Sequence, residues 1–188
     1  MKKLLAIIVL SFATTLAQAN AVINHWVHSS GALVYLVEAR TIPMIDLQID
    51  WYAGSVNDPK HQLGLAGMTA GMIDKGSMLN GRLITEAEVS DRLADLGAGL
   101  SFSASAERAS MRLRTLSDEK KKVAAIDLAS SVLKAPVFDS KILKREQERT
   151  VSAIKEADLK PETKLSKEFD RQMYGQHPFA DSPTVKTI

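Results

Sequence analysis

Apolar and polar residues alternate along residues 44–53 of this 188-residue chain. The apolar positions are Ile45, Leu47, Ile49 and Trp51, and the residues between them are mostly polar. Because successive side chains of a strand point to opposite faces, this alternation predicts a half-buried β-strand.

Three further strands follow from similar patterns. The apolar run at residues 31–37 predicts a buried strand, and residues 22–30 before it are interpreted as an irregular polar lead-in. Residues 99–106 and 110–116 both alternate, and the short polar segment between them favours an antiparallel hairpin.

Helical spacing and capping residues predict five helices. Thr85 followed three residues later by Glu88 is a capping box, and Gly97 would end that helix. Pro161 is suited to the first turn of the last helix, with Gly175 just beyond its end. The expected helices span residues 63–75, 85–97, 117–133 (capped by Ser117), 139–157 (capped by Asp139 or Ser140) and 161–174.

The resulting order is two strands, two helices, two strands and three helices. Strands in adjacent pairs followed by groups of helices favour an α+β fold with an antiparallel-rich sheet packed on helices. Residues 78–83, between the first two helices, are treated as a loop.

The first 21 residues have the features of a secretory signal peptide. Lys2 and Lys3 precede an apolar run to Leu16, and Ala17-Gln18-Ala19 is a small-x-small cleavage pattern. A cut after Ala21 would also fit. The sequence therefore predicts an exported protein, most simply in a bacterial periplasm, whose mature domain is residues 22–188 and has no membrane segment.

Charge and composition exclude several classes of function. Without Lys2 and Lys3, 22 basic residues stand against 22 acidic ones, and only 5% of the residues are aromatic. Neither a basic patch nor a stacking platform for nucleic acid is indicated. The absence of cysteine excludes disulfides and thiolate metal ligands.

Residues 64–77, G-L-A-G-M-T-A-G-M-I-D-K-G-S, are the most informative stretch. Gly67 and Gly71 lie four residues apart in a predicted helix, where each glycine costs about 1 kcal/mol relative to alanine. From spacing alone, Gly67, Ala70 and Gly71 would let a neighbouring helix approach closely.

The same stretch resembles the metal-binding helix of the pitrilysin/insulinase zinc peptidases. Active members carry H-x-x-E-H between Gly-Leu-Ala and a short Gly-Thr/Ser, and Pro43 and Gly54-Ser55 around the strand at residues 44–53 match the family too. Two histidines at i and i+4 hold one zinc ion, and the glutamate activates its bound water. The resemblance covers most of residues 22–188 and implies the first domain of such a protein, incomplete at its C-terminus.

The resemblance also implies that the catalytic groups have been lost. The histidine positions correspond to Gly67 and Gly71, and the general-base position corresponds to Ala70. Active members take a third ligand from a later helix, and the best register places Ala153 there, with Glu146 at a second functional position seven residues earlier. In a slipped register, Glu148 or Glu156 would be the ligand.

Other candidate residues have simpler interpretations. His25, His28 and His61 are interpreted as surface residues, and His177 as part of a docking turn. Charged runs at residues 118–122 and 141–149 suit solvated helix faces with pairs such as Lys144 and Glu148. Arg112 and Arg114 would share one strand face, either at a solvated strand edge or facing a chamber that holds peptide carboxylates.

These features predict a non-catalytic, exported subunit that binds no cofactor itself. The family resemblance implies pairing with an active H-x-x-E-H subunit, which would hold the zinc, for the degradation or processing of peptides. Two alternatives remain open: a structural or scaffold protein of the same fold without a proteolytic role, and a truncated, non-functional fragment.

Overall fold

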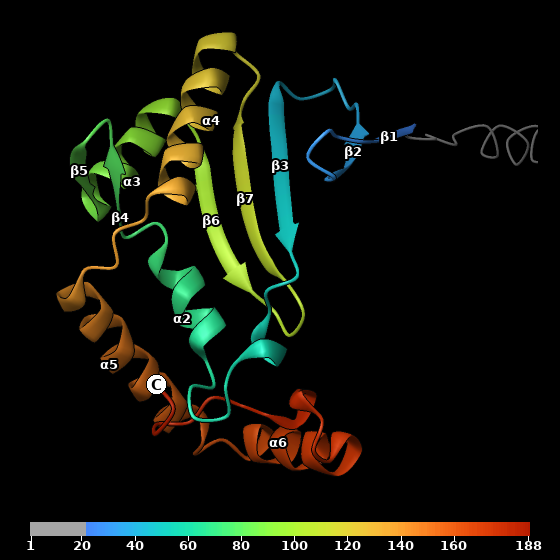
Figure 1. Cartoon of the computed structure of the whole chain (residues 1–188), viewed down its shortest axis with the longest axis vertical. Coiled ribbons are helices and arrows are strands. Elements are labelled where there is room, and N and C mark those ends of the chain that lie inside the picture. Colours follow the sequence, from blue (N-terminus) through green and yellow to red (C-terminus); the bar gives the residue numbers. More distant parts are fainter. Residues whose placement is uncertain (1–21) are drawn as a thin grey trace, which may run out of the picture. The chain divides into compact units, whose positions relative to one another are not determined.

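The computed structural model describes residues 22–188, and residues 1–21, where the signal peptide is predicted, lie outside the described part. The chain divides after Ile42 into two units, whose helices and strands are drawn in Figure 1. The described part of the first unit is a small hairpin, and the second unit, Pro43–Ile188, contains every other element.

The first unit pairs β1 (Ile23–Val27) with β2 (Leu33–Val37) in antiparallel register. The prediction of an irregular lead-in at residues 22–30 is therefore wrong, because residues 23–27 form a strand. The predicted burial of β2 is also wrong: Leu33 and Tyr35 are each 67% exposed. A two-stranded hairpin of this kind has no second layer of its own to cover its side chains.

A three-stranded antiparallel sheet forms the base of the second unit. Its order is β3 (Met44–Trp51), β7 (Ala109–Leu116) and β6 (Gly99–Ala104), so β7 lies in the middle. The strand β3 and the hairpin of β6 and β7 are confirmed, but the apolar face of β3 is less buried than predicted, with Leu47, Ile49 and Trp51 36–37% exposed. Together with the helices, this sheet confirms the α+β fold class.

A second hairpin joins β4 (Gly76–Leu79) to β5 (Arg82–Thr85). The prediction of a loop at residues 78–83 is therefore wrong. The two turn residues, Asn80 and Gly81, both have positive φ angles, 51° and 76°. Asn-Gly with this geometry is the preferred two-residue turn of a β-hairpin.

The five helices of the second unit lie close to their predicted positions. Thr85 and Glu88 form the expected capping box, Gly97 ends α3 in the left-handed region, and Asp139 caps α5. One cap differs: Asp118, not Ser117, accepts the N–H of Lys121 and starts α4. The helices are α2 (Leu65–Met72), α3 (Glu86–Leu96), α4 (Glu119–Lys134), α5 (Ser140–Ala157) and α6 (Pro161–Tyr174), with short 3-10 turns η2 (Ser55–Asn57) and η3 (Pro178–Ala180).

The core lies where α4 packs on the sheet and on α3. One cluster joins Ile84, Val89, Leu128 and Val132, and a second places Leu113 of the sheet against alanines of α4. Fully burying each large apolar side chain stabilises the fold by about 1.5–3 kcal/mol. By contrast, neither α5 nor α6 contains a buried residue, so both lie outside this core. No helix of the described chain is both long enough and apolar enough to cross a bilayer.

Candidate functional site

Helix α2 is held in place by the loop that precedes it. Gly64 precedes the helix with a φ of 102° and provides no side-chain cap. Asp58 supplies the cap instead, because its carboxylate accepts the backbone N–H of Gly64 at 2.9 Å and that of Ala66 at 3.0 Å. A carboxylate at a helix N-terminus also interacts favourably with the helix dipole.

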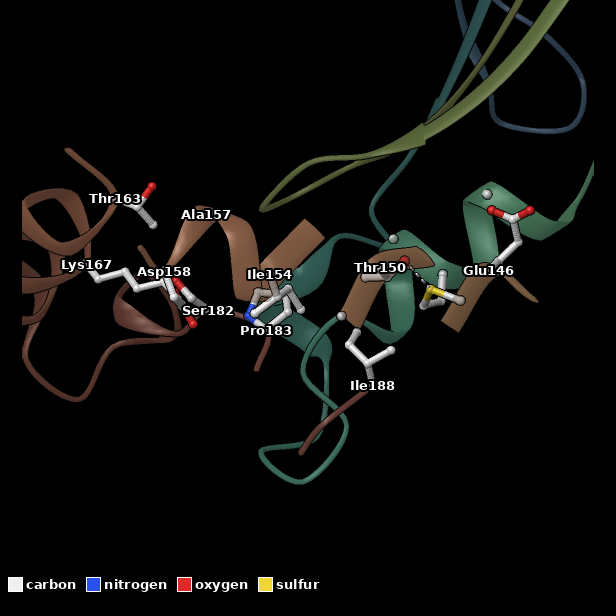
Figure 2. Close-up of a pocket in the computed structure, with 14 residues that line it drawn as sticks. Glu146, Thr150, Ile154, Ala157, Asp158, Thr163, Lys167, Ser182, Pro183 and Ile188 are labelled. Atoms are coloured by element: carbon white, nitrogen blue, oxygen red, sulfur yellow. Dashed lines mark hydrogen bonds and ion pairs between the residues drawn. The ribbon is translucent and has the colours of Figure 1, made fainter. Parts of the chain in front are cut away.

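A cavity of about 480 Å³ lies between α2 and α5 (Figure 2). The start of α6 and the C-terminal segment, residues 182–188, complete its wall. Most of the lining is apolar, and the residues are Gly64, Gly67, Met68, Gly71, Glu146, Thr150, Ile154, Ala157, Asp158, Thr163, Lys167, Ser182, Pro183 and Ile188.

The two helix glycines face this open space. A Cβ atom built on Gly67 or on Gly71 would meet nothing within 4 Å. Close approach of a neighbouring helix, the simplest interpretation of their spacing, is therefore wrong for both residues. Ala70, between them in sequence, differs: it is 5% exposed and does not line the cavity.

Of the residues expected on helix α5, only Glu146 lines the cavity. Glu146, Thr150 and Ile154 line the cavity, and the Thr150 hydroxyl donates to the sulfur of Met68 at 3.5 Å. Ala153, in the register predicted for the third ligand, is exposed and absent from the lining. Glu148 and Glu156 are exposed as well and do not line the cavity.

Glu146 lies in a network of charges at one end of the cavity. Its carboxylate is 2.7 Å from Arg145 and 3.9 Å from Arg149. Arg145 also contacts Glu86 of α3 at 2.9 Å, and Lys75 contacts Glu86 at the same distance. Hydrogen bonds from Lys75 and then Arg145 lower the pKa of Glu86, and the bond to Glu86 raises the pKa of Lys75.

The other end of the cavity is closed by α6 and the C-terminal segment. Lys167 lies 2.7 Å from Asp158, which links the middle of α6 to the C-terminal end of α5. Gln147 donates to the backbone carbonyl of Ile188 at 2.8 Å, and Lys60 forms an ion pair with Asp181. These contacts hold residues 181–188 against α5 and against the loop that precedes α2.

Comparison with known protein families finds a match over most of the chain. The family described as Insulinase (Peptidase family M16) matches residues 34–185, more than three quarters of the chain. The chain belongs to this family. None of the curated proteins compared with the chain matches it.

Solved structures agree with the family assignment. A peptidase M16 inactive domain from Pseudomonas fluorescens superposes with a TM-score of 0.78 at 29% identity, over 87% of this chain and 38% of that one. Pitrilysin matches with a TM-score of 0.69 at 18% identity, over 91% of this chain and 18% of its own length. The periplasmic protease PqqL from Escherichia coli matches with a TM-score of 0.70 at 12% identity, over 91% of this chain and 19% of its own length. The last two support the fold alone. The chain therefore spans well under half the length of these relatives.

Peptidases of family M16 are typically zinc-dependent, and the residues of this site do not fit a zinc ion. Glycine and alanine at positions 67, 70 and 71 carry no donor atom, and zinc sites are built from imidazole, thiolate or carboxylate groups. Within residues 22–188, no three His, Asp or Glu side chains lie together as a possible metal site.

The histidines of this M16 domain lie elsewhere. His61 is exposed and does not line the cavity, and His25 and His28 belong to the separate first unit. His177 accepts the N–H of Phe179 at 3.2 Å and so caps η3. Its predicted role in docking stays a prediction.

Arg112 and Arg114 lie on the polar face of the central strand β7. The interpretation of a strand edge is therefore wrong. Arg114 donates to Asp46 at 2.6 Å, and this bond lowers the pKa of Asp46; Arg112 donates to Gln48 at 3.0 Å. Both cations are exposed and take part in cross-strand pairs.

Proposed function

We propose that this M16 chain is a non-catalytic, exported subunit that pairs with an active, zinc-containing M16 peptidase and contributes to degrading or processing peptides. In this proposal Gly67 and Gly71 occupy the positions of the two zinc-binding histidines, and Ala70 that of the general base. The chain then needs no cofactor of its own, and the zinc belongs to the partner subunit.

One observation carries the proposal: Gly67 and Gly71 face a cavity, and no other residue packs against the side-chain positions of either glycine. Glycine in a helix interior is unfavourable, so its presence normally has a packing or functional reason. Close packing is excluded at both positions, and vacated ligand positions are consistent with the space in front of them. The relative from Pseudomonas fluorescens, itself an inactive M16 domain, supports the same interpretation.

In this proposal the position of the third ligand lies on α5. The register that the family resemblance favours puts it at Ala153, whereas the residues of α5 that line the cavity are Glu146, Thr150, Ile154 and Ala157. Glu146 would correspond to the second functional carboxylate of active members and is engaged here with Arg145 and Arg149.

Affinity purification of the tagged full chain from its own cells, followed by mass spectrometry, tests the pairing. We expect an M16 subunit bearing H-x-x-E-H to co-purify in a defined ratio, and an unstructured peptide to be cleaved by the pair but not by this chain alone. A matched control replaces the partner's motif glutamate with glutamine, which should abolish cleavage while the two subunits remain bound.

Other outcomes would contradict the proposal. Co-purification with non-peptidase proteins alone would favour a structural or scaffold role. Aggregation of the expressed chain, with no partner recovered, would favour a truncated, non-functional fragment. Stoichiometric zinc together with peptide cleavage by this chain alone would show that it is itself a peptidase.

A further inference from the structure

The cavity between α2 and α5 has remained open, and the proposed loss of a metal site does not explain why. A site that lost its metal ligands could have collapsed or been filled by larger side chains. Protein interiors are normally close-packed, with few voids larger than a water molecule. Here about 480 Å³ remains open, within the range of volumes typical of small-molecule sites.

Apolar groups form the middle of the cavity. Met68 of α2 and Ile154 of α5 contribute side chains from opposite walls, and Pro183 and Ile188 contribute from the C-terminal segment. The bare Cα atoms of the two helix glycines complete the surface. Methionine is flexible and polarizable, so Met68 can adapt to groups of different shape.

The charged groups of the lining already have partners. Glu146 is paired with Arg145 and Arg149, and Asp158 is paired with Lys167. The hydroxyl of Thr150 is engaged with the sulfur of Met68. A charged ligand would lose its hydration on entering the cavity and would find no unpaired opposite charge there, which is unfavourable. The lining therefore selects against ions and favours uncharged groups.

We propose that the cavity binds a compact, uncharged apolar group, an aromatic ring or a branched aliphatic chain, supplied either by a peptide side chain or by a free small molecule. The group would lie between Met68 and Ile154, over the Cα atoms of Gly67 and Gly71. Binding here does not require a partner subunit, so this proposal and the proposed function can fail separately.

Methyl NMR spectroscopy of the full chain tests the proposal with two uncharged probes. Toluene represents a free small molecule, and N-acetyl-phenylalanine amide represents a peptide side chain. We expect saturable shifts of the Met68 and Ile154 methyl signals with at least one probe. The stronger of the two identifies the source, and benzoate, which carries a charge, should bind at least tenfold more weakly than toluene.

Cavity-filling variants make the test specific. Gly67→Leu and Gly71→Leu place a side chain into the open space and should weaken binding at least tenfold. Ser152→Leu adds the same side chain to an exposed position of α5 outside the lining and should leave binding unchanged. If a leucine variant fails to fold, Gly67→Ala offers a smaller change, with a smaller loss of affinity expected.

Two results would overturn the proposal. The first is the lack of any saturable methyl shift with both probes at millimolar concentration in the folded protein. The second is binding that persists unchanged in both folded leucine variants, because the ligand would then occupy another place.

Discussion

The hydroxyl of Thr150 donates to the sulfur of Met68 at 3.5 Å and links α5 to α2 in the middle of the candidate site. Met68 follows Gly67, and the cavity lies open beside this contact. A hydrogen bond to a thioether is weak, so it does not replace the packing that larger residues at positions 67 and 71 would provide. The two helices of the site are thus in contact without filling the space between them.

Replacing either helix glycine by alanine should stabilise the protein. Gly67→Ala and Gly71→Ala each remove a flexible residue from a helix where the new methyl group meets no neighbour, so we expect a gain of about 0.5–1 kcal/mol in the free energy of unfolding. Urea denaturation measures it. Gly97→Ala is the matched control and should be destabilising, because Gly97 has a φ of 61°. Destabilisation by the first two variants would indicate close packing at α2.

The ion pairs of Glu86 should make stability depend on pH. Lys75 and Arg145 lower the pKa of Glu86 below its ordinary value of about 4.5 in the folded state. Their contribution is therefore present above about pH 4.5 and is lost as the pH falls through the folded-state value.

Glu86→Gln should accordingly reduce the free energy of unfolding at pH 7, by less than about 1 kcal/mol for a partly exposed group. The difference from the parent protein should shrink as the pH falls below 4.5, the ordinary value of this carboxyl. Denaturant titrations between neutral and acidic pH measure it, with the exposed Glu148→Gln as control. A difference that grows toward acidic pH would contradict the assignment.

Ser77 should be important for attaching the β4–β5 hairpin to α4. It is fully buried, and its hydroxyl lies 3.0 Å from the carbonyl oxygens of Ser131 and Ala135. Ser77→Ala should lower the free energy of unfolding by about 1 kcal/mol, the net value of a typical intramolecular hydrogen bond. Ser103→Ala, on an exposed strand position, should change it by less than half as much. Equal effects in thermal unfolding would contradict this role.

Much of the fold follows from local signals in the sequence. Thr85 and Glu88 mark a helix start within four residues, and the alternation along β3 identifies its two faces. The β4–β5 hairpin also has a local signal, Asn80-Gly81, although residues 78–83 are predicted above as a loop. β1 was missed because Asn24 and His25 interrupt its apolar residues.

The candidate site could be predicted only in part. The family resemblance identified Gly67 and Gly71, but the open cavity depends on how far α5 lies from α2, which no local pattern determines. The same holds for Ile188, which lines the cavity from the far end of the sequence. The position of Ala153 on the exposed face of α5 likewise depends on the packing of the whole helix.

The predicted signal peptide has a direct test. Expression of the full chain in a Gram-negative host should give a periplasmic protein that begins at Asn20 or at Val22, because cleavage should follow Ala19 or Ala21. Intact-mass measurement of the periplasmic fraction distinguishes the two cuts. Replacing both alanines of the first pattern, Ala17→Leu with Ala19→Leu, should prevent that cut. A cytoplasmic protein that retains Met1 or begins at Lys2 would contradict export.

The most direct test of the central claim is a zinc titration of the folded parent chain and of two folded variants. The first variant carries Gly67→His, Ala70→Glu, Gly71→His and Ala153→Glu. A second variant carries Thr150→Glu in place of Ala153→Glu and compares the two positions on α5. We expect no stoichiometric zinc on the parent chain and one zinc ion per chain on at least one restored variant. Tight binding of one zinc ion by the parent chain would contradict the account.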